Sequence, residues 1–120
     1  MTDLTLAHSR ADDRLTLAAI NDAFRRQGPG GDGHWVITAS VSAVNPMFAH
    51  LAIGRVRAFA DFTSDNDPSG EHDFGSFTLG QHRLFWKIDY FDRDLEYGSP
   101  DPLDASVTTR VLTVMLASDY

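Results

Sequence analysis

The segment FGSFTLGQHRLFWKIDYFD, residues 74–92, constrains the fold more than any other part of this 120-residue chain. Leu79-Gly80-Gln81 separates two runs rich in aromatic and apolar residues, and this pattern predicts a β-hairpin. In the second run the side chains alternate between the two faces of a strand. One face takes Leu84, Trp86, Ile88 and Tyr90, and the other takes Arg83, Phe85, Lys87, Asp89 and Phe91. Because the second face also carries phenylalanines, we expect a helix or a partner to cover part of it.

Three helices and one further strand are predicted outside the hairpin. Ser9 or Asp12 is expected to cap a helix that ends near Gln27. Disorder is left open for residues 1–8, which precede this helix. The residues HWVITASV at 34–41 predict a strand, because β-branched and aromatic side chains dominate them. Asn45-Pro46 then predicts the start of a second helix. Its inner stripe is expected to contain Phe48, Leu51, Ala52, Val56 and Phe59.

A last helix is predicted after the proline-containing segment RDLEYGSPDP at 93–102. Asp104 is expected to cap it, and Arg110 is expected either on its surface or reaching back to the acidic loop. Its apolar face would consist of Val107, Val111, Val114 and Met115. The predicted fold is therefore α+β: a small, mainly antiparallel sheet of about three strands packed with three helices, in the order α-β-α-β-β-α.

Composition narrows the class of protein further. The length fits one domain, 1–120. The chain has no cysteine, which excludes disulfides and thiolate zinc sites. No window approaches the roughly 18 apolar residues of a membrane span, and the N-terminus lacks a signal pattern. We therefore expect a cytoplasmic protein without a cofactor.

Acidic residues are concentrated in one third of the chain. The net charge is −7, and residues 61–104 hold eleven acids against Arg83, Lys87 and Arg93. This concentration disfavours direct contact with nucleic-acid phosphates and leaves a basic partner, a cation or simple solubility as its explanation; we expect a protein with a basic surface. Aromatic residues among the acids suit a protein interface, and a homo-oligomer remains open. The candidate interaction surface comprises Asp65, Asp67, Glu71, His72, Asp73, Trp86, Lys87, Asp89, Tyr90, Asp92 and Tyr97.

The stretch DNDPSGEHDFG, residues 65–75, has two further interpretations. Glu71, His72 and Asp73 are a ligand set that zinc, manganese or iron can use, which makes a metal-dependent hydrolase or metal-binding protein the alternative hypothesis. The start of a calcium loop is also present, but its twelfth position is Ser76 where a bidentate glutamate is needed. In the simplest interpretation the acids and Asn66 only stabilise turns through hydrogen bonds to the backbone.

Several long blocks resemble a bacterial family known as domain of unknown function 3768. These blocks are INDAFRRQGPGG, VRAFADFTSDNDP, FWKIDYFDRDLEYGSPDP and TTRVLTVMLASDY, so the resemblance covers nearly the whole chain after about residue 14. It implies a small single-domain protein, often encoded on plasmids, phages or integrated elements, and it implies no activity. Combined with the acidic segment, it leads to the hypothesis of an interaction module that regulates or inhibits a partner and is encoded by a mobile genetic element.

Overall fold

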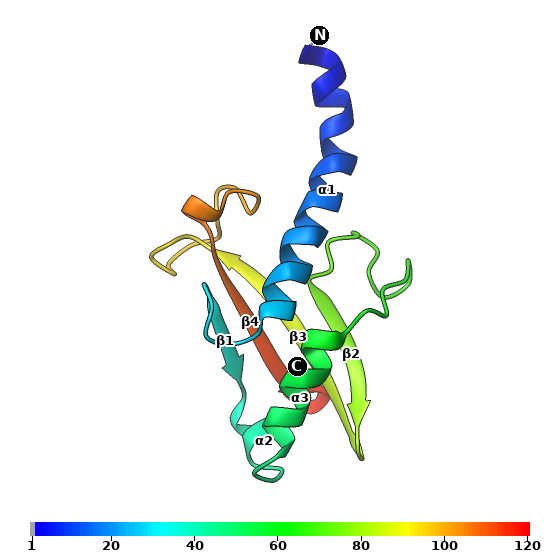
Figure 1. Cartoon of the computed structure of the whole chain (residues 1–120), viewed down its shortest axis with the longest axis vertical. Helices are drawn as coiled ribbons and strands as arrows, with labels where there is room; N and C mark the ends of the chain where they lie inside the picture. Colours follow the sequence, from blue (N-terminus) through cyan, green and yellow to red (C-terminus); the bar gives the residue numbers. More distant parts are fainter. Residues whose placement is uncertain (1) are drawn as a thin grey trace.

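The computed structural model describes residues 2–120, with side chains from Asp13 onward except that of Leu15, and contains one mixed sheet with helices against it (Figure 1). The helices are α1 (Thr2–Gln27), α2 (Ala39–Ser42) and α3 (Phe48–Ala58). The strands are β1 (His34–Ile37), β2 (Phe74–Leu79), β3 (His82–Phe91) and β4 (Thr109–Leu116), and two short 3₁₀ turns, η1 (Ala105–Val107) and η2 (Ala117–Asp119), flank β4. None of the described helices is both long enough and apolar enough to cross a bilayer.

The sheet is built around the predicted hairpin. Its strand order is β1-β4-β3-β2. The strands β2 and β3 pair antiparallel and close at Leu79 and His82, with Gly80 at φ +62° in the turn, as the sequence predicts. β4 pairs antiparallel with β3 and parallel with β1. The prediction of an α+β fold is therefore confirmed, whereas the sheet has four strands in a mixed arrangement instead of about three antiparallel ones.

The predicted last helix is wrong, because residues 109–116 form the strand β4. β4 lies between β1 and β3 and is buried along most of its length, so apolar residues occur on both of its faces. A strand buried on both faces has no clear alternation and can match a helical spacing by chance. Asp104 does act as a cap, but of the 3₁₀ turn η1, where its carboxylate accepts a hydrogen bond from the Ser106 N–H at 2.9 Å.

The other helices also differ from the prediction in their limits. α1 begins at Thr2, ahead of the predicted caps, and ends at Gln27 as predicted. The predicted strand at 34–41 ends at Ile37, and its last residues form α2. α3 begins at Phe48, three residues after Asn45. Asn45 nevertheless stabilises the turn before it, because its side chain accepts a hydrogen bond from the Met47 N–H at 3.0 Å.

The core lies between the sheet and α3. Leu84 and Trp86 of β3 are fully buried, as are Ala52 and Val56 of α3. Each large apolar side chain buried in this way stabilises the fold by about 1.5–3 kcal/mol. Leu51, which the helical spacing places on the inner stripe, is instead 50% exposed. The buried stripe of α3 thus follows a strict spacing of four residues.

The opposite face of the sheet carries the second set of hairpin side chains. Phe74 and Phe85 lie there, and the ring of Tyr120 packs edge-on against them at centroid distances of 6.1 and 5.4 Å. The residues after β4 therefore supply part of the cover that the sequence analysis expected from a helix or a partner. Lys87 and Asp89 form an ion pair of 3.0 Å on the same face.

Candidate functional site

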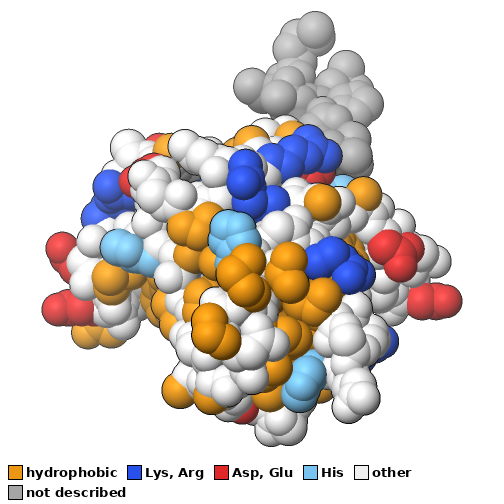
Figure 2. Space-filling model, turned by 60° about the horizontal axis from the view of Figure 1, so that its bottom comes forward, with side chains coloured by type: hydrophobic (Ala, Val, Ile, Leu, Met, Phe, Trp, Pro, Cys, Tyr) orange, Lys and Arg blue, Asp and Glu red, His pale blue; other side chains and the backbone are white. Residues whose placement is uncertain are grey.

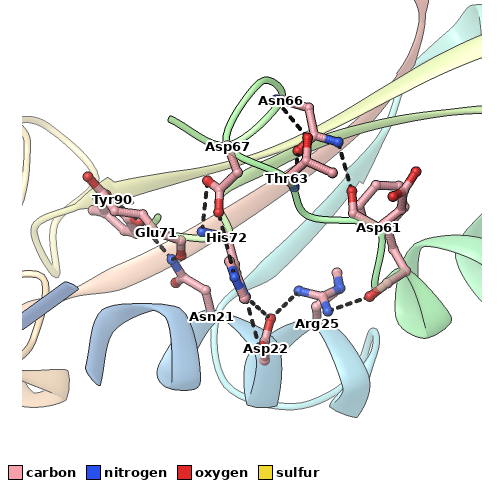
Figure 3. Close-up of polar contacts among 11 residues, drawn as sticks. Asn21, Asp22, Arg25, Asp61, Thr63, Asn66, Asp67, Glu71, His72 and Tyr90 are labelled. Carbon is pink, nitrogen blue, oxygen red and sulfur yellow. Dashed lines mark hydrogen bonds and ion pairs between the residues drawn. The ribbon is translucent and has the colours of Figure 1, made fainter. Parts of the chain in front are cut away.

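A buried polar network joins α1 to the sheet at the end remote from α2 (Figure 3). Its centre is Asn21, whose side chain is completely buried. The Asn21 amide donates to the hydroxyl of Tyr90 at 2.8 Å and to the backbone carbonyl of Glu71 at 2.9 Å. Its carbonyl oxygen accepts from Nε of Arg110 at 2.8 Å. One side chain thus links α1, β3, β4 and the loop between α3 and β2.

Tyr90 and Arg110 complete the network. The Tyr90 hydroxyl donates to the Glu71 carboxylate at 3.1 Å. Burial, with the nearby carboxylates of Asp73 and Glu71, raises the pKa of Tyr90 well above its ordinary value, although the Asn21 hydrogen bond acts in the other direction, so the phenol stays protonated. The Arg110 guanidinium lies 5.2 Å from the centre of the Tyr90 ring and donates to the Pro102 carbonyl. Burial lowers the pKa of Arg110. Its predicted position on a helix surface is wrong, because it is buried in β4.

His72 lies between two carboxylates next to this network (Figure 3). Its Nδ1 is 3.0 Å from an Asp22 oxygen, and its Nε2 is 3.6 Å from Oδ2 of Asp67. The imidazole stacks flat on the Phe62 ring at 3.8 Å. The backbone of His72 has φ +56°, and its N–H donates to Asp67 at 3.3 Å. Such a conformation is uncommon outside glycine, and these contacts hold it in place.

Arg25 carries a fully buried charge on α1, one turn after Asn21. It donates to Asp22 at 2.9 Å and to the Phe59 carbonyl at 2.8 Å. Its guanidinium lies 5.2 Å from the ring centre of Trp86, in cation–π contact. Burial raises the pKa of Asp22, but the hydrogen bonds from Arg25 and His72 outweigh it and bring the pKa below its usual value. The charges of Arg25 and Asp22 are therefore compensated inside the fold.

The loop that the sequence analysis singled out is a turn network in its first half. The Asn66 side chain accepts from the Thr63 N–H at 2.7 Å and donates to the Asp61 carbonyl at 2.7 Å. Asp67 is buried, whereas Asp65 is exposed. The acids of this loop thus divide between the interior and solvent.

Glu71, His72 and Asp73 do not converge on one point. Glu71 turns toward Tyr90, and His72 turns toward Asp22 and Asp67 (Figure 3). Asp73 is half-buried, and burial, followed by repulsion from Glu71, raises its pKa. Among the side chains described from residue 13 onward, no group of three or more histidines and acids is placed to hold a metal ion.

The remaining predicted residues lie in three separate places. Trp86 is fully buried in the core. Lys87 and Asp89 form an ion pair on the face of the sheet opposite to the core. Asp92 and Tyr97 belong to the connection between β3 and η1, residues 92–104, which we call the 92–104 loop. The structure therefore does not gather the eleven predicted residues into one surface.

The 92–104 loop holds two apolar side chains in solvent. Tyr97 is 72% exposed and Leu95 is 47% exposed. The Asp92 N–H donates to the Tyr97 carbonyl at 2.8 Å, and the Asp92 carboxylate accepts from the Glu96 N–H at 3.0 Å. Leu95 has φ +61°, which is strained for a residue other than glycine. The loop is thus hydrogen-bonded across its own turn.

Sequence reasoning missed Asn21, Asp22, Arg25 and Arg110 as parts of the site. The only local signal was the pair Asp22 and Arg25, whose spacing of three residues places both on one side of a helix. The contact between Asn21 and Arg110 joins residues 89 positions apart. No pattern within one segment can reveal such a contact.

Comparison with known proteins gives one match. Residues 37–119 match the family described as "Protein of unknown function (DUF3768)". No curated protein and no solved structure matches the chain.

Proposed function

Because the chain belongs to the family described as protein of unknown function (DUF3768), we propose its function from its geometry: it is an interaction module that binds a basic protein through the 92–104 loop. This proposal narrows the acidic surface expected from residues 61–104 to the part that also exposes large apolar side chains, Leu95 and Tyr97. The observation that carries it is the exposure of Tyr97 and Leu95 on a loop that is hydrogen-bonded across its own turn.

The shape of the loop supports this proposal. Aromatic anchors on a preorganised surface bind with a small loss of conformational freedom. The Phe91 backbone forms an isolated bridge with Gly98, and the Ser99 N–H donates to the Tyr90 carbonyl at 3.0 Å. These contacts fix both sides of the segment that carries Leu95 and Tyr97. The Leu95 N–H closes the turn by donating to the Asp92 carbonyl at 3.1 Å, and its exposed side chain is left accessible to a partner.

The charge of the loop supports a basic partner. Its acids are Asp92, Asp94, Glu96, Asp101 and Asp104. Its one cation, Arg93, is already occupied, because it donates to the Thr108 carbonyl at 2.9 Å and lies 3.9 Å from an Asp32 oxygen. Carboxylates in the same loop as an aromatic anchor attract lysine- and arginine-rich surfaces and speed their association at low salt.

The buried network holds the 92–104 loop through hydrogen bonds to the backbone of the loop. Arg110 donates to the Pro102 carbonyl at 2.6 Å, and Asn21 fixes Arg110 in turn. Tyr90 holds the other end of the loop through its carbonyl. In this proposal the role of Asn21, Tyr90 and Arg110 is to position the binding surface. The mobile-element setting that the sequence resemblance implied suits a regulator or inhibitor of the bound protein.

Site-specific photocrosslinking tests the proposal. A photoreactive phenylalanine analogue in place of Tyr97 should crosslink a basic protein in cells that express the chain. The crosslink should be lost when Asp94 and Glu96 are both changed to lysine, and it should weaken as salt is raised. The same analogue at Tyr120, which is similarly exposed, is the matched control and should not capture that protein.

Two results would contradict the proposal. One is a crosslink from Tyr97 that persists in the Asp94→Lys/Glu96→Lys double variant. The other is the same product from both tyrosine positions. A thermal melt of the double variant separates loss of binding from loss of fold, because both acids are exposed and their replacement should change stability by no more than about 0.5 kcal/mol each.

A further inference from the structure

The strand β2 forms an edge of the sheet and leaves part of its backbone unpaired. Ile88 donates to the Asp73 carbonyl, so residues 73, 75, 77 and 79 exchange hydrogen bonds with β3. Phe74, Ser76 and Thr78 therefore direct their backbone N–H and C=O groups away from the sheet. Such an edge can accept another extended chain.

A groove runs along this edge. Its volume is about 620 Å³, and it lies between the end of α3, the segment after it and β2. The backbone edge at Ser76 and Thr78 forms one wall, and Ala58 and Phe59 belong to the other. A groove between a helix and an edge strand can hold an extended peptide, with hydrogen bonds on one side and side-chain contacts on the other.

Two arginines lie along the groove. Arg55 donates to the Thr78 carbonyl at 3.3 Å and lies 5.2 Å from the centre of the Phe77 ring. Arg83 donates to the Ser76 hydroxyl at 2.8 Å. The edge is therefore flanked by two positive charges, and the one carboxylate among the groove residues is that of Asp61.

The surroundings of the groove are poor in acid, although the whole chain has a net charge of −7. Residues 33–60 contain no aspartate or glutamate, and α3 ends with Arg55 and Arg57. Figure 2 shows hydrophobic, arginine and histidine side chains over the centre of the face near α2 and α3, with acidic side chains at its margins. An acidic ligand is thus attracted to this side of the molecule and repelled elsewhere.

We propose that the groove between α3 and β2 binds an extended acidic segment of a partner protein as a fifth strand of the sheet. The backbone of the segment pairs with Phe74, Ser76 and Thr78, and its carboxylates bind Arg55 and Arg83. When a carboxylate takes the Arg55 guanidinium, the Thr78 carbonyl becomes free to accept from the incoming strand. Recognition of an acidic side chain and pairing with the β2 edge are therefore coupled. A neutral strand does not displace Arg55, so the Thr78 carbonyl stays bonded to Arg55 and cannot accept from that strand.

A second copy of the chain is a poorer occupant. Two β2 edges in antiparallel contact would bring Arg55 and Arg83 of both copies to the same seam, and like charges there repel. This site is independent of the 92–104 loop, which follows the far end of β3. The two surfaces select opposite charges.

The test uses the full chain and a labelled eight-residue peptide that alternates threonine with glutamate, beside a version with lysine in place of glutamate. Amide NMR shifts should map the glutamate peptide to Phe74, Ser76 and Thr78, and fluorescence polarisation should show at least about tenfold weaker binding of the lysine peptide, as expected for loss of a charge-assisted contact. Arg55→Glu and Arg83→Glu should each weaken the glutamate peptide by a similar factor. Arg14→Glu is the matched control, because Arg14 is exposed on α1 and does not line the groove, and it should leave binding within about twofold.

Edge pairing is tested separately by Ser76→Pro, which removes one outward N–H at a position where an edge strand tolerates proline. A melt confirms that this variant is folded, and Ser76→Ala, which keeps the N–H, should bind as the original chain does. The proposal is overturned if neither peptide binds, if both bind equally, if the shifts lie elsewhere, or if folded Ser76→Pro still binds. It is also overturned if the chain is a dimer in solution that Ser76→Pro separates, because a second copy then occupies the edge.

Discussion

Replacement of Asn21 by alanine should weaken the attachment of α1 and of the 92–104 loop to the sheet. The substitution removes two hydrogen bonds between neutral groups and one to the charged guanidinium of Arg110, which stays buried without that partner. Ordinary bonds contribute about 0.5–1.5 kcal/mol each and charged ones about 1.5–3 kcal/mol, so we expect a loss of about 3–5 kcal/mol. This is a large part of the roughly 5–15 kcal/mol that stabilises a typical domain.

Urea unfolding followed by tryptophan fluorescence measures this loss, since Trp86 is completely buried. With a slope of about 1–3 kcal/mol per molar urea, the midpoint should fall by roughly 2 M without a change in slope. Thr16→Ala is the matched control on the same helix, because Thr16 is exposed and its replacement should change stability by no more than about 0.5 kcal/mol.

A second pair of variants tests whether the unpaired arginine causes the loss. Asn21→Leu alone leaves Arg110 buried without its partner, whereas Asn21→Leu combined with Arg110→Met replaces both groups by apolar side chains of similar length. The double variant should be more stable than Asn21→Leu. If Asn21→Ala lies within about 1 kcal/mol of Thr16→Ala, the network does not hold α1 and the reasoning is refuted.

Three further predictions follow from the burial and spacing of single residues. Asp73→Asn should stabilise the chain at neutral pH: a carboxyl whose folded pKa is raised contributes its stability below the unfolded value of 3.8 and loses it as pH rises through the folded pKa. Its advantage in urea unfolding should therefore grow between about pH 4 and 7, and a constant advantage would contradict this cause. Gly75→Ala should cost about 1–3 kcal/mol because the new methyl group would collide with the Trp86 indole, whereas Gly54→Ala on α3, with no atom within 4 Å, should stabilise by about 0.5–1 kcal/mol. Zinc or manganese should leave the melting temperature unchanged, since both ring nitrogens of His72 already face carboxylates; a rise that grows with metal concentration and disappears in His72→Ala would support the metal-site hypothesis instead.

The sequence was sufficient where a structure depends on neighbours along the chain. The hairpin at 74–91 combines alternation with a turn, and both signals are local. The strand β4 was not predictable in the same way, since its environment is set by β1 and β3 on either side. Its threonines, in TTRVLTVML, were a weak signal against a helix.

The candidate site, too, could be predicted where its contacts are local in sequence and could not be predicted where they join distant segments. Turn-forming residues around Asn66 could be recognised, because their hydrogen bonds stay within five residues. The burial of Arg25 could not, since a basic residue in the last turn of a helix is favourable in solvent too. The groups that compensate the charge of Arg25 belong to different segments of the chain. Only the tertiary fold brings the Trp86 ring and the Phe59 carbonyl into contact with its guanidinium.

The place of β4 in the sheet has a consequence for synthesis on the ribosome. β1 and β3 are both joined to β4, which is the last strand in chain order. While the nascent chain is still shorter than about residue 116, β1 has no strand to pair with, and β3 lacks its second neighbour in the sheet. We expect the emerging polypeptide to expose apolar surface for the roughly 1–5 seconds needed to translate residues 92–116, at the usual rate of roughly 5–20 residues per second. Chaperones that shield such surfaces should therefore bind nascent chains from which β4 has not yet emerged and release those in which it has left the ribosome.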